Sequence, residues 1–411
     1  MSLRRLLGLS AAVSGRLSRS LSTSTAASSR PPWILVDQVA AATGSAAPGA
    51  SVRIVEPPCL SDLTVPAFLV DTSAGPDSDS DVMQLLSGSV CSASAAASSS
   101  SPSTTSAPRV PSSPSRAPII HTRFLCNPLT GQLTRLPAIN TGAKKLLCGP
   151  HMGVLIQAGR GHRIAVAELQ GNKMLRFLSD TGKWDIAVTA PRQLPLARRF
   201  YSDSGMYDQE AFAFGGRLWW ADLSWGAISA GPFSDRPEPR FVELSRGSVM
   251  PERPEPAHGW LDVEGAEAVS KRELGRYRRM GVSEGRVRYA EVWQREPFVL
   301  SSFALDDEGG GWTLEHRVVL SRLLAEGDYP WLPSLEKTAP QIGALDPLNG
   351  NVMYLMVGRH SMSVDMSKEE VIGSTLQSAQ RRQLVHTMRK DNTGSKTLAD
   401  VLVRSDRHRT K

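Results

Sequence analysis

Residues 281–285 place a serine between two glycines, in a pattern that can form a nucleophile elbow. The segment reads Gly-Val-Ser-Glu-Gly. Such an elbow needs an apolar strand before the serine and a helix after it, so that the hydroxyl stands on a tight turn above a parallel sheet. Here Arg276-Tyr-Arg-Arg-Met280 precedes the motif and a strand-like segment, 286–293, follows it. We therefore expect a β-turn, and no nucleophilic role for Ser283.

Two other groups of residues could in principle hold a phosphate or a metal ion. Gly159-Arg-Gly-His-Arg163 has closely spaced glycines, but it lacks the Lys-Ser/Thr of a P-loop and the third glycine of a dinucleotide-binding loop. A hairpin turn between 154–156 and 164–166 explains it more simply. His121, His151 and His162 could form a metal site with carboxylates only if the fold brought residues from distant parts of the sequence together. No two histidines stand at the spacing that would place them on one face of a helix. The sequence predicts no catalytic residue, no metal site and no cofactor.

The densest basic stretch in the body of the chain runs from Lys271 to Arg279 and continues in the next strand. Six of its residues are candidate contacts for a partner or for RNA: Arg276, Tyr277, Arg278, Arg279, Arg286 and Arg288. Arginines pair with phosphates, and interleaved tyrosines can stack on single-stranded RNA. The simpler hypothesis is a solvated strand-and-loop face whose arginines pair with Glu264, Glu267 and Glu273. An acidic protein partner is a third.

Tryptophan is the aromatic residue that stands out in the same region. We expect these side chains to pack in the core and between strands, and to form binding hot spots only if some line the mouth of a central channel. They are Trp219, Trp220, Trp225, Trp293, Trp312 and Trp331.

The elements that position these residues are short strands. Segments 33–36 and 52–55 are apolar runs bounded by proline and glycine. Residues 63–70 form a third, in which Pro66 predicts an edge strand or a bulge. The Ser/Pro/Ala-rich segment 74–118 cannot bury enough apolar surface to offset its ordering entropy, so we expect a solvated insertion or linker.

Recurring turns predict how the strands are organised. Segments 127–131 and 346–350 share an Asx-Pro-Leu-polar-Gly turn, and acidic turns containing glycine precede Trp184 and Trp312. Asx caps its own turn, Pro sets φ, and Gly takes the positive φ that closes it. A period in the forties, typical of four-stranded propeller blades, approximately accounts for the turn glycines Gly131, Gly182, Gly311 and Gly350. The predicted fold class is all-β and propeller-like, with a two-sheet sandwich as the alternative.

The domain organisation follows from these patterns. Residues 210–223 predict a hairpin around Gly215-Gly216. Ser367–Arg389 carries a modest helical pattern broken by Gly373, and leads into a basic tail that we expect to be flexible. The expected parts are a signal at 1–30, first β strands at 31–73, the insertion at 74–118, the propeller-like β domain at 119–365, and a short helix with a basic tail at 366–411.

Positive charge is concentrated at the two ends of the chain. The formal net charge is +7. Residues 1–30 contain five arginines and no acid, and residues 376–411 contain nine lysines and arginines against three aspartates. The body between them is therefore mildly acidic, so it has no overall electrostatic footprint for nucleic acid.

Composition excludes several other classes. The four cysteines include no C-x-x-C pair, so we expect reduced thiols and neither a disulfide scaffold nor a common zinc site. No run of eighteen apolar residues occurs, which excludes a membrane-spanning helix.

The first thirty residues predict a mitochondrial import signal. Wound as a helix, residues 3–21 place their arginines on one face and their leucines on the other. The segment is rich in serine and threonine and free of acid until Asp37, as transit peptides are. A plastid transit peptide is the alternative, because 20–29 is nearly all hydroxyl residues and alanine, and a tail without an address is a further one.

The chain resembles a plant protein family, expanded in grasses, that is known as domain of unknown function 1618. The resemblance rests on Trp33-Ile-Leu-Val-Asp37, the 127–131 turn, the block Phe214-Gly-Gly-Arg-Leu-Trp-Trp-Ala-Asp-Leu223 with Trp225-Gly226, and the strand that contains Trp312. It covers most of the chain from Trp33 to about His360. The turn motif also resembles F-box-associated and kelch-type propeller domains, which bind proteins. The family implies no reaction, cofactor or catalytic residue.

The sequence therefore favours a non-enzymatic β scaffold that binds an unidentified protein in an organelle. Two alternatives stay open. One is an RNA-binding factor that uses the arginine-rich stretch 271–288, and the other is an enzyme whose site assembles at the mouth of a propeller channel. The sequence does not indicate the oligomeric state.

Overall fold

Short antiparallel strands make up nearly all of the computed structural model. It describes residues 33–37, 39–43, 49–66, 85–93, 120–127, 131–139, 152–157, 163–191, 210–249, 273–307, 310–326, 339–377, 385–389 and 401–408. All of them belong to the unit 32–411. The described part contains the α-helix α2 (Leu320–Glu326) and no helix that is long and apolar enough to cross a membrane. The all-β prediction is confirmed, whereas the predicted signal at 1–30 lies outside the described residues.

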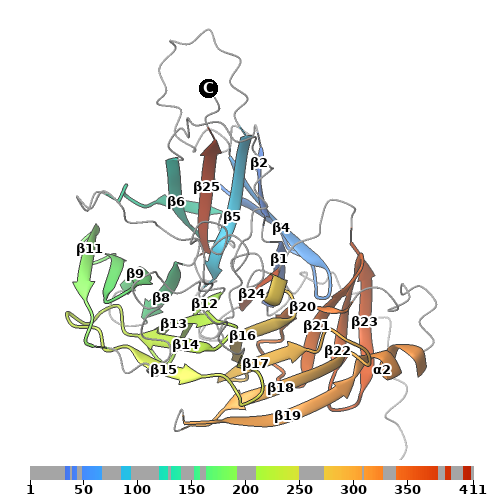
Figure 1. Cartoon of the computed structure of the whole chain (residues 1–411). Helices are drawn as coiled ribbons and strands as arrows, with labels where there is room; N and C mark the ends of the chain where they lie inside the picture. The colour runs from blue at the N-terminus through green and yellow to red at the C-terminus, as the bar shows by residue number, and fades with distance from the viewer. Residues whose placement is uncertain are drawn as a thin grey trace, which may run out of the picture. The chain divides into compact units, whose positions relative to one another are not determined.

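Four sheets each contain four strands in sequence order (Figure 1). The first sheet is β8 (Gly153–Gln157), β9 (Arg163–Gln170), β10 (Lys173–Leu178) and β11 (Lys183–Val188). The second is β12 (Glu210–Phe214), β13 (Arg217–Asp222), β14 (Gly226–Ala230) and β15 (Arg240–Glu243). The third is β16 (Arg278–Ser283), β17 (Arg286–Val292), β18 (Val299–Leu305) and β19 (Trp312–Val319). The fourth is β20 (Gln341–Leu345), β21 (Val352–Val357), β22 (His360–Asp365) and β23 (Glu370–Leu376).

Local turn chemistry explains the hairpins within these sheets. Gly215 and Gly216 both have positive φ and join β12 to β13, as predicted. Glu284 and Gly285, with φ of 50° and 73°, join β16 to β17 in the same way. Positive φ at both central positions is the requirement of a tight hairpin turn whose twist matches the flanking strands.

The fifth sheet combines the two ends of the chain. Its strands run in the order β24-β1-β4-β2-β5-β25-β6-β7, and β3 also pairs with β4. They are β1 (Trp33–Asp37), β2 (Val39–Thr43), β3 (Ser51–Arg53), β4 (Leu60–Pro66), β5 (Leu85–Ala93), β6 (Ile120–Asn127), β7 (Gln132–Arg135), β24 (Val385–Arg389) and β25 (Val401–His408). The antiparallel pairing of β1 with β24 joins residues more than 350 positions apart, such as Leu35 and Thr387.

The core lies between neighbouring sheets. Five clusters of buried apolar side chains each combine residues of two sheets, and together they connect the five sheets in a closed ring. Each of these pairs shares one cluster: Leu125 and Val154, Leu155 and Trp220, Phe212 and Tyr289, Leu300 and Leu355, and Leu35 and Tyr354. The five sheets are thus arranged as the blades of a propeller, and not as the two-sheet sandwich.

Several predictions about individual segments need correction. The described residues of Ser367–Arg389 form no helix: they contain β23 and β24, and β23 alternates exposed and half-buried residues as a strand does. Residues 85–93, within the segment 74–118, form β5 between β2 and β25. Residues 401–408 of the basic tail form β25. Pro66 does not mark an edge strand, because β4 pairs on both sides and Pro66 is its last residue.

The sequence repeat from one sheet to the next is longer than the predicted period of forty-odd residues. The first strands of the four regular sheets begin at Gly153, Glu210, Arg278 and Gln341. Long connections between sheets, and not longer strands, account for the difference. The turn glycines therefore do not recur at a constant spacing, although each lies at a blade turn.

Candidate functional site

The six residues predicted to contact a partner or RNA all lie on or beside the β16–β17 hairpin. Arg278 and Arg279 belong to β16, Arg286 and Arg288 belong to β17, and the two strands pair directly. Neighbouring residues of a strand point to opposite faces, whereas residues two apart share a face. The hairpin therefore brings Arg286 and Arg288 together and sends Arg278 and Arg279 to different surroundings.

Arg279 is a buried connection between three sheets. Its side chain is 1% exposed, and its Nη1 donates to Glu210 Oε1 of β12 at 3.0 Å. Its Nη2 donates to the carbonyl oxygen of Ile342 in β20 at 2.6 Å. The second oxygen of Glu210 accepts a hydrogen bond from the Met280 amide at 2.5 Å. Burial lowers the pKa of Arg279, and the negative charge of Glu210 opposes that shift. These contacts make Arg279 inaccessible to RNA.

Arg278 serves a similar role on the other face of β16. Its Nη1 donates to the carbonyl oxygens of Leu223 and Ser248, both at 2.7 Å, in the preceding sheet and the segment after it. Its Nη2 lies 3.5 Å from Glu291 Oε2, which also accepts a hydrogen bond from the Tyr289 hydroxyl. Burial raises the pKa of Tyr289 well above its ordinary value. This network stabilises the boundary between the second and third sheets.

Arg286 and Arg288 converge on Glu315 of β19. Arg286 Nη1 lies 3.3 Å from Glu315 Oε1, and Arg288 forms an ion pair with the other carboxylate oxygen. Arg288 also donates to Glu284 Oε2 at 3.1 Å. A Cβ at Gly350 would lie 2.3 Å from the Arg288 guanidinium carbon. The buried Arg288 guanidinium therefore occupies the space that a side chain at position 350 would need.

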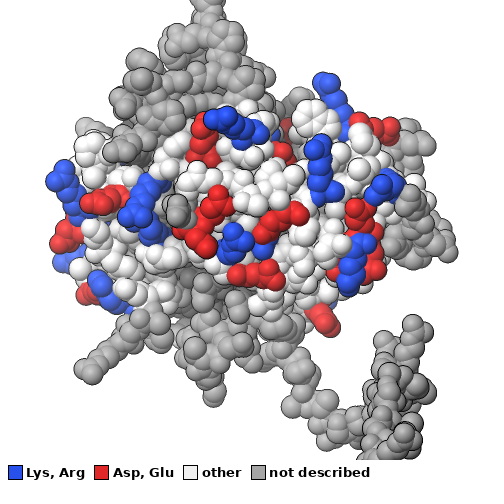
Figure 2. Space-filling model, turned by 90° about the horizontal axis from the view of Figure 1, so that it is seen from below, with Lys and Arg blue, Asp and Glu red and all other residues white. Residues whose placement is uncertain are grey.

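The remaining two residues of the predicted set differ in exposure. Tyr277 is partly buried against the core between the third and fourth sheets, and burial raises its pKa. Arg276 is half-exposed and lies 3.4 Å from Glu273, one of the three acids predicted to pair with this stretch. The other two acids lie outside the described residues. On the face shown in Figure 2, basic and acidic groups alternate, and neither sign forms a continuous field.

Asp346 and Tyr354 form a carboxyl–phenol pair in which the pKa values of both groups are raised. Burial raises the pKa of Asp346, and burial together with the nearby carboxylate raises that of Tyr354. The Tyr354 hydroxyl donates to Asp346 Oδ2 at 3.3 Å, while Asp346 Oδ1 accepts from the amides of Leu348 and Asn349. The predicted Asx cap of the 346–350 turn is confirmed. These interactions all lie within the turn and the strand β21 that follows it, so the geometry assigns both groups to the fold.

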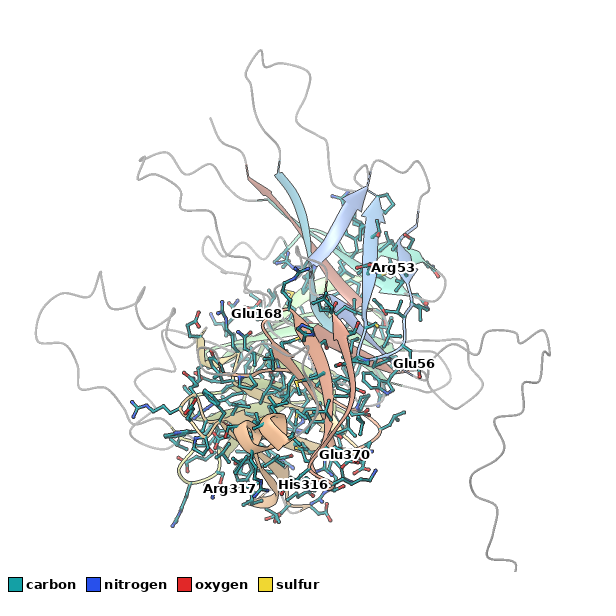
Figure 3. All side chains as sticks on the ribbon, turned by 90° about the vertical axis from the view of Figure 1, so that its right-hand side faces the viewer. Arg53, Glu56, Glu168, His316, Arg317 and Glu370 are labelled. Carbon is teal, nitrogen blue, oxygen red and sulfur yellow. The ribbon has the colours of Figure 1, made fainter. Side chains whose placement is uncertain are left out.

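Ser283 and His316 also have hydrogen-bond partners within the fold. The Ser283 hydroxyl is buried and donates to the carbonyl oxygen of Asp346 at 2.5 Å, and a strand follows it, as expected of a hairpin. His316 Nε2 lies 2.9 Å from Asn351 Oδ1. Within the described residues no group of three metal-ligating side chains comes together. Figure 3 shows charged and imidazole side chains from several sheets pointing in different directions: Arg53, Glu56, Glu168, His316, Arg317 and Glu370.

Tryptophans behave in two ways. Trp219, Trp220 and Trp225 are buried, as predicted. Trp184 and Trp312 each donate from the indole nitrogen to a carbonyl oxygen of the preceding sheet or the segment after it, at Pro137 and Glu243. These bonds link neighbouring sheets.

Trp293 is a correction to the expectation that tryptophans are buried. It is 61% exposed. It follows the last residue of β17.

Sequence reasoning missed the acid that completes the buried network. Glu210 opens the otherwise apolar strand Glu-Ala-Phe-Ala-Phe and is completely buried. A charge at the start of such a strand is a signal that a partner of opposite sign must be buried with it. Arg279 could not be identified as that partner from sequence alone, because 69 residues separate the two.

Residues 220–354 match the model of a family described as a protein of unknown function, DUF1618. This match confirms the predicted resemblance over that segment. No curated protein matches the chain in sequence.

Two solved structures are similar to the chain at low scores. The β-propeller domain of Cps50 (Swd1) from Myceliophteria thermophila has a TM-score of 0.30 at 7% identity, over 71% of this chain and 91% of that one. A proposed 6-phosphogluconolactonase from Bacteroides uniformis has a TM-score of 0.24 at 12% identity, over 62% of this chain and 78% of that one. Neither likeness is strong enough to bear on function.

Proposed function

We propose that this chain is a non-enzymatic scaffold that binds another protein in the mitochondrion. The observation that carries the proposal is the use of the arginine-rich hairpin inside the fold. Arg278, Arg279 and Arg288 bind acids and carbonyl groups of their own or adjacent sheets. Side chains committed in this way hold blades together and leave the loops to make contacts with a partner, as loops on a rigid scaffold commonly do.

The organelle assignment rests on the amino-terminal sequence. Residues 1–30 combine arginines, hydroxyl residues and a leucine-rich face without any acid, which is the composition of a mitochondrial signal. The plastid is the alternative destination. The resemblance to a plant family is consistent with either organelle.

Binding of the full chain to protein and to RNA can be compared directly. We expect the purified chain to capture a specific protein from a mitochondrial extract, and the complex to survive nuclease treatment and re-form from purified components. Labelled oligouridine should bind weakly and without dependence on Arg276. The affinity of the Arg276→Glu variant for oligouridine should therefore equal that of the wild type. A complex that nuclease dissolves, or RNA binding that Arg276→Glu abolishes, would favour the RNA-binding alternative.

A further inference from the structure

The loop between β17 and β18 presents an exposed tryptophan. Five consecutive residues, Trp293 to Pro297, are exposed. Trp293 is 61% exposed and is the one exposed aromatic side chain in the described part of the chain. The other exposed large apolar side chains there are Val188, Leu314, Leu348, Ile372 and Leu376. An exposed tryptophan presents the side-chain type that is enriched at protein interfaces and among their binding hot spots.

The base of this loop is held firmly. The Trp293 amide donates to the carbonyl oxygen of Val299 at 2.9 Å, and the Phe298 amide donates to that of Arg295 at 2.8 Å. The ring of Phe298 is buried in the core between the third and fourth sheets, although its φ of 50° is unusual for a bulky residue. The Leu320 amide, at the start of α2, donates to the Phe298 carbonyl oxygen. An anchor that is already ordered loses little conformational entropy on binding.

The charges beside Trp293 are available for contacts with a partner. Arg295 and Glu296 are both exposed, and neither forms an ion pair with any residue that the structure describes. Arg276 lies at the same end of the hairpin, because the Val292 amide donates to the carbonyl oxygen of the adjacent Tyr277. Tryptophan and arginine are the side chains most enriched among binding hot spots between proteins.

The same surroundings disfavour RNA. Binding of single-stranded RNA uses several aromatic faces along a continuous basic groove. Here the acids Glu273 and Glu296 accompany Arg276 and Arg295, and Tyr277 packs against the core. A single exposed indole between opposite charges is complementary to a protein surface.

We propose that this loop is the docking anchor of the scaffold, an inference that rests on the proposed protein-binding function. Trp293 inserts into an apolar socket of a folded partner protein. One acidic and one basic side chain at the rim of that socket pair with Arg295 and Glu296.

The test uses the full chain with a photo-reactive phenylalanine analogue at position 293, and with the same analogue at 376 as a control. Leu376 is exposed to the same fraction, 61%, but lies on β23. The protein crosslinked through position 293 in mitochondrial extract is then purified and titrated with wild type, Trp293→Ala, Trp293→Phe, Arg295→Glu and Leu376→Ser. Thermal unfolding of each variant checks that the fold is unchanged.

We expect Trp293→Ala to weaken the dissociation constant at least ~30-fold, as hot-spot tryptophans do. Trp293→Phe should recover part of this loss, Arg295→Glu should weaken binding about tenfold, and Leu376→Ser should stay within about twofold. A partner that binds Trp293→Ala as tightly as wild type would overturn the loop assignment and leave the scaffold function standing. Absence of any specific protein partner would overturn both. Trp293-dependent binding of oligouridine would replace the protein socket with RNA stacking.

Discussion

Arg279 and Glu210 are buried together at the junction of three sheets, so each charge depends on the other. Removing one partner of such a pair leaves an uncompensated charge in the interior, which costs about 3–5 kcal/mol. We expect Arg279→Met to lower the free energy of unfolding by about that amount, measured by urea denaturation with tryptophan fluorescence. Arg276→Met removes a half-exposed pair on the same hairpin and should cost less than ~1 kcal/mol. Equal losses in the two variants would contradict the role of the buried pair.

Gly350 tests the contact between the third and fourth sheets. A methyl group there would overlap the Arg288 guanidinium, whose buried position leaves it little room to move. We expect Gly350→Ala to reduce stability by about 1–3 kcal/mol through this overpacking. Gly310 is the matched control, because a Cβ at that position meets no atom within 4 Å. Comparable thermal unfolding of Gly350→Ala and Gly310→Ala would show that Arg288 moves freely.

Asp346 should make stability depend on pH in the direction opposite to most carboxylates. Burial raises its pKa, so below the raised value the native state binds the proton more tightly than the unfolded chain does. Its contribution is therefore present at low pH and is lost as the pH rises through the raised pKa. The titratable groups that act on the Asp346 carboxyl are Tyr354, through a hydrogen bond, and Glu284, through its negative charge.

The urea midpoints of the wild type and of Asp346→Asn should therefore depend differently on pH. As the pH is lowered from neutrality, the midpoint of the wild type should rise relative to that of the variant. Asp365 is the control of opposite sign, because the hydrogen bond from Ser367 lowers its pKa. Its contribution is present above the ordinary aspartate pKa and disappears as the pH falls. A difference in urea midpoint between the wild type and Asp346→Asn that does not change with pH would rule out a raised pKa for Asp346.

At the scale of elements, the sequence predicts local features well and distant pairings poorly. The Asp346 turn and the Gly215-Gly216 hairpin were predictable because their residues interact within a few positions. Strand β5 was not, because its serine-rich sequence has no apolar alternation and its pairing with β25 joins residues such as Leu86 and Arg407. The structural use of Arg279 was missed for the same reason. A basic run shows the kind of charge present, but its partner lies elsewhere in the chain.

Strand β25 provides the test of this distant pairing. It pairs with β5 on one side and with β6 on the other. Removing residues 396–411 should leave both neighbours with unpaired edges and reduce stability by about 3 kcal/mol or more, because β25 forms eight pairs with β5 and seven with β6 and each cross-strand pair contributes about 0.2–1 kcal/mol. The exposed edges should also promote aggregation, visible by size-exclusion chromatography. Removing only 409–411 is the control. A shortened chain that unfolds at the wild-type urea concentration would show that the last sixteen residues do not complete the sheet.

For the whole molecule, the amino-terminal end of the fold sets a limit on where the proposed import signal could be cut. Trp33 is buried and its ring meets that of Tyr354 edge to face, with centroids 5.2 Å apart. The strand that begins at Trp33 pairs with β24 and so connects the first and last parts of the ring. Cleavage beyond Trp33 would remove part of this connection, whereas cleavage before it would leave the fold complete.

Two measurements on one fusion protein follow from this limit. The full chain with a carboxy-terminal fluorescent protein should reach mitochondria, and the same chain without residues 1–30 should stay in the cytosol, because it has lost the arginine-rich, acid-free sequence of the proposed signal. Sequencing of the imported protein should place its first residue at or before Trp33. Signal from plastids would select the alternative destination. Cytosolic fluorescence from the full chain, or a mature end inside β1, would contradict an import signal that ends ahead of the folded ring.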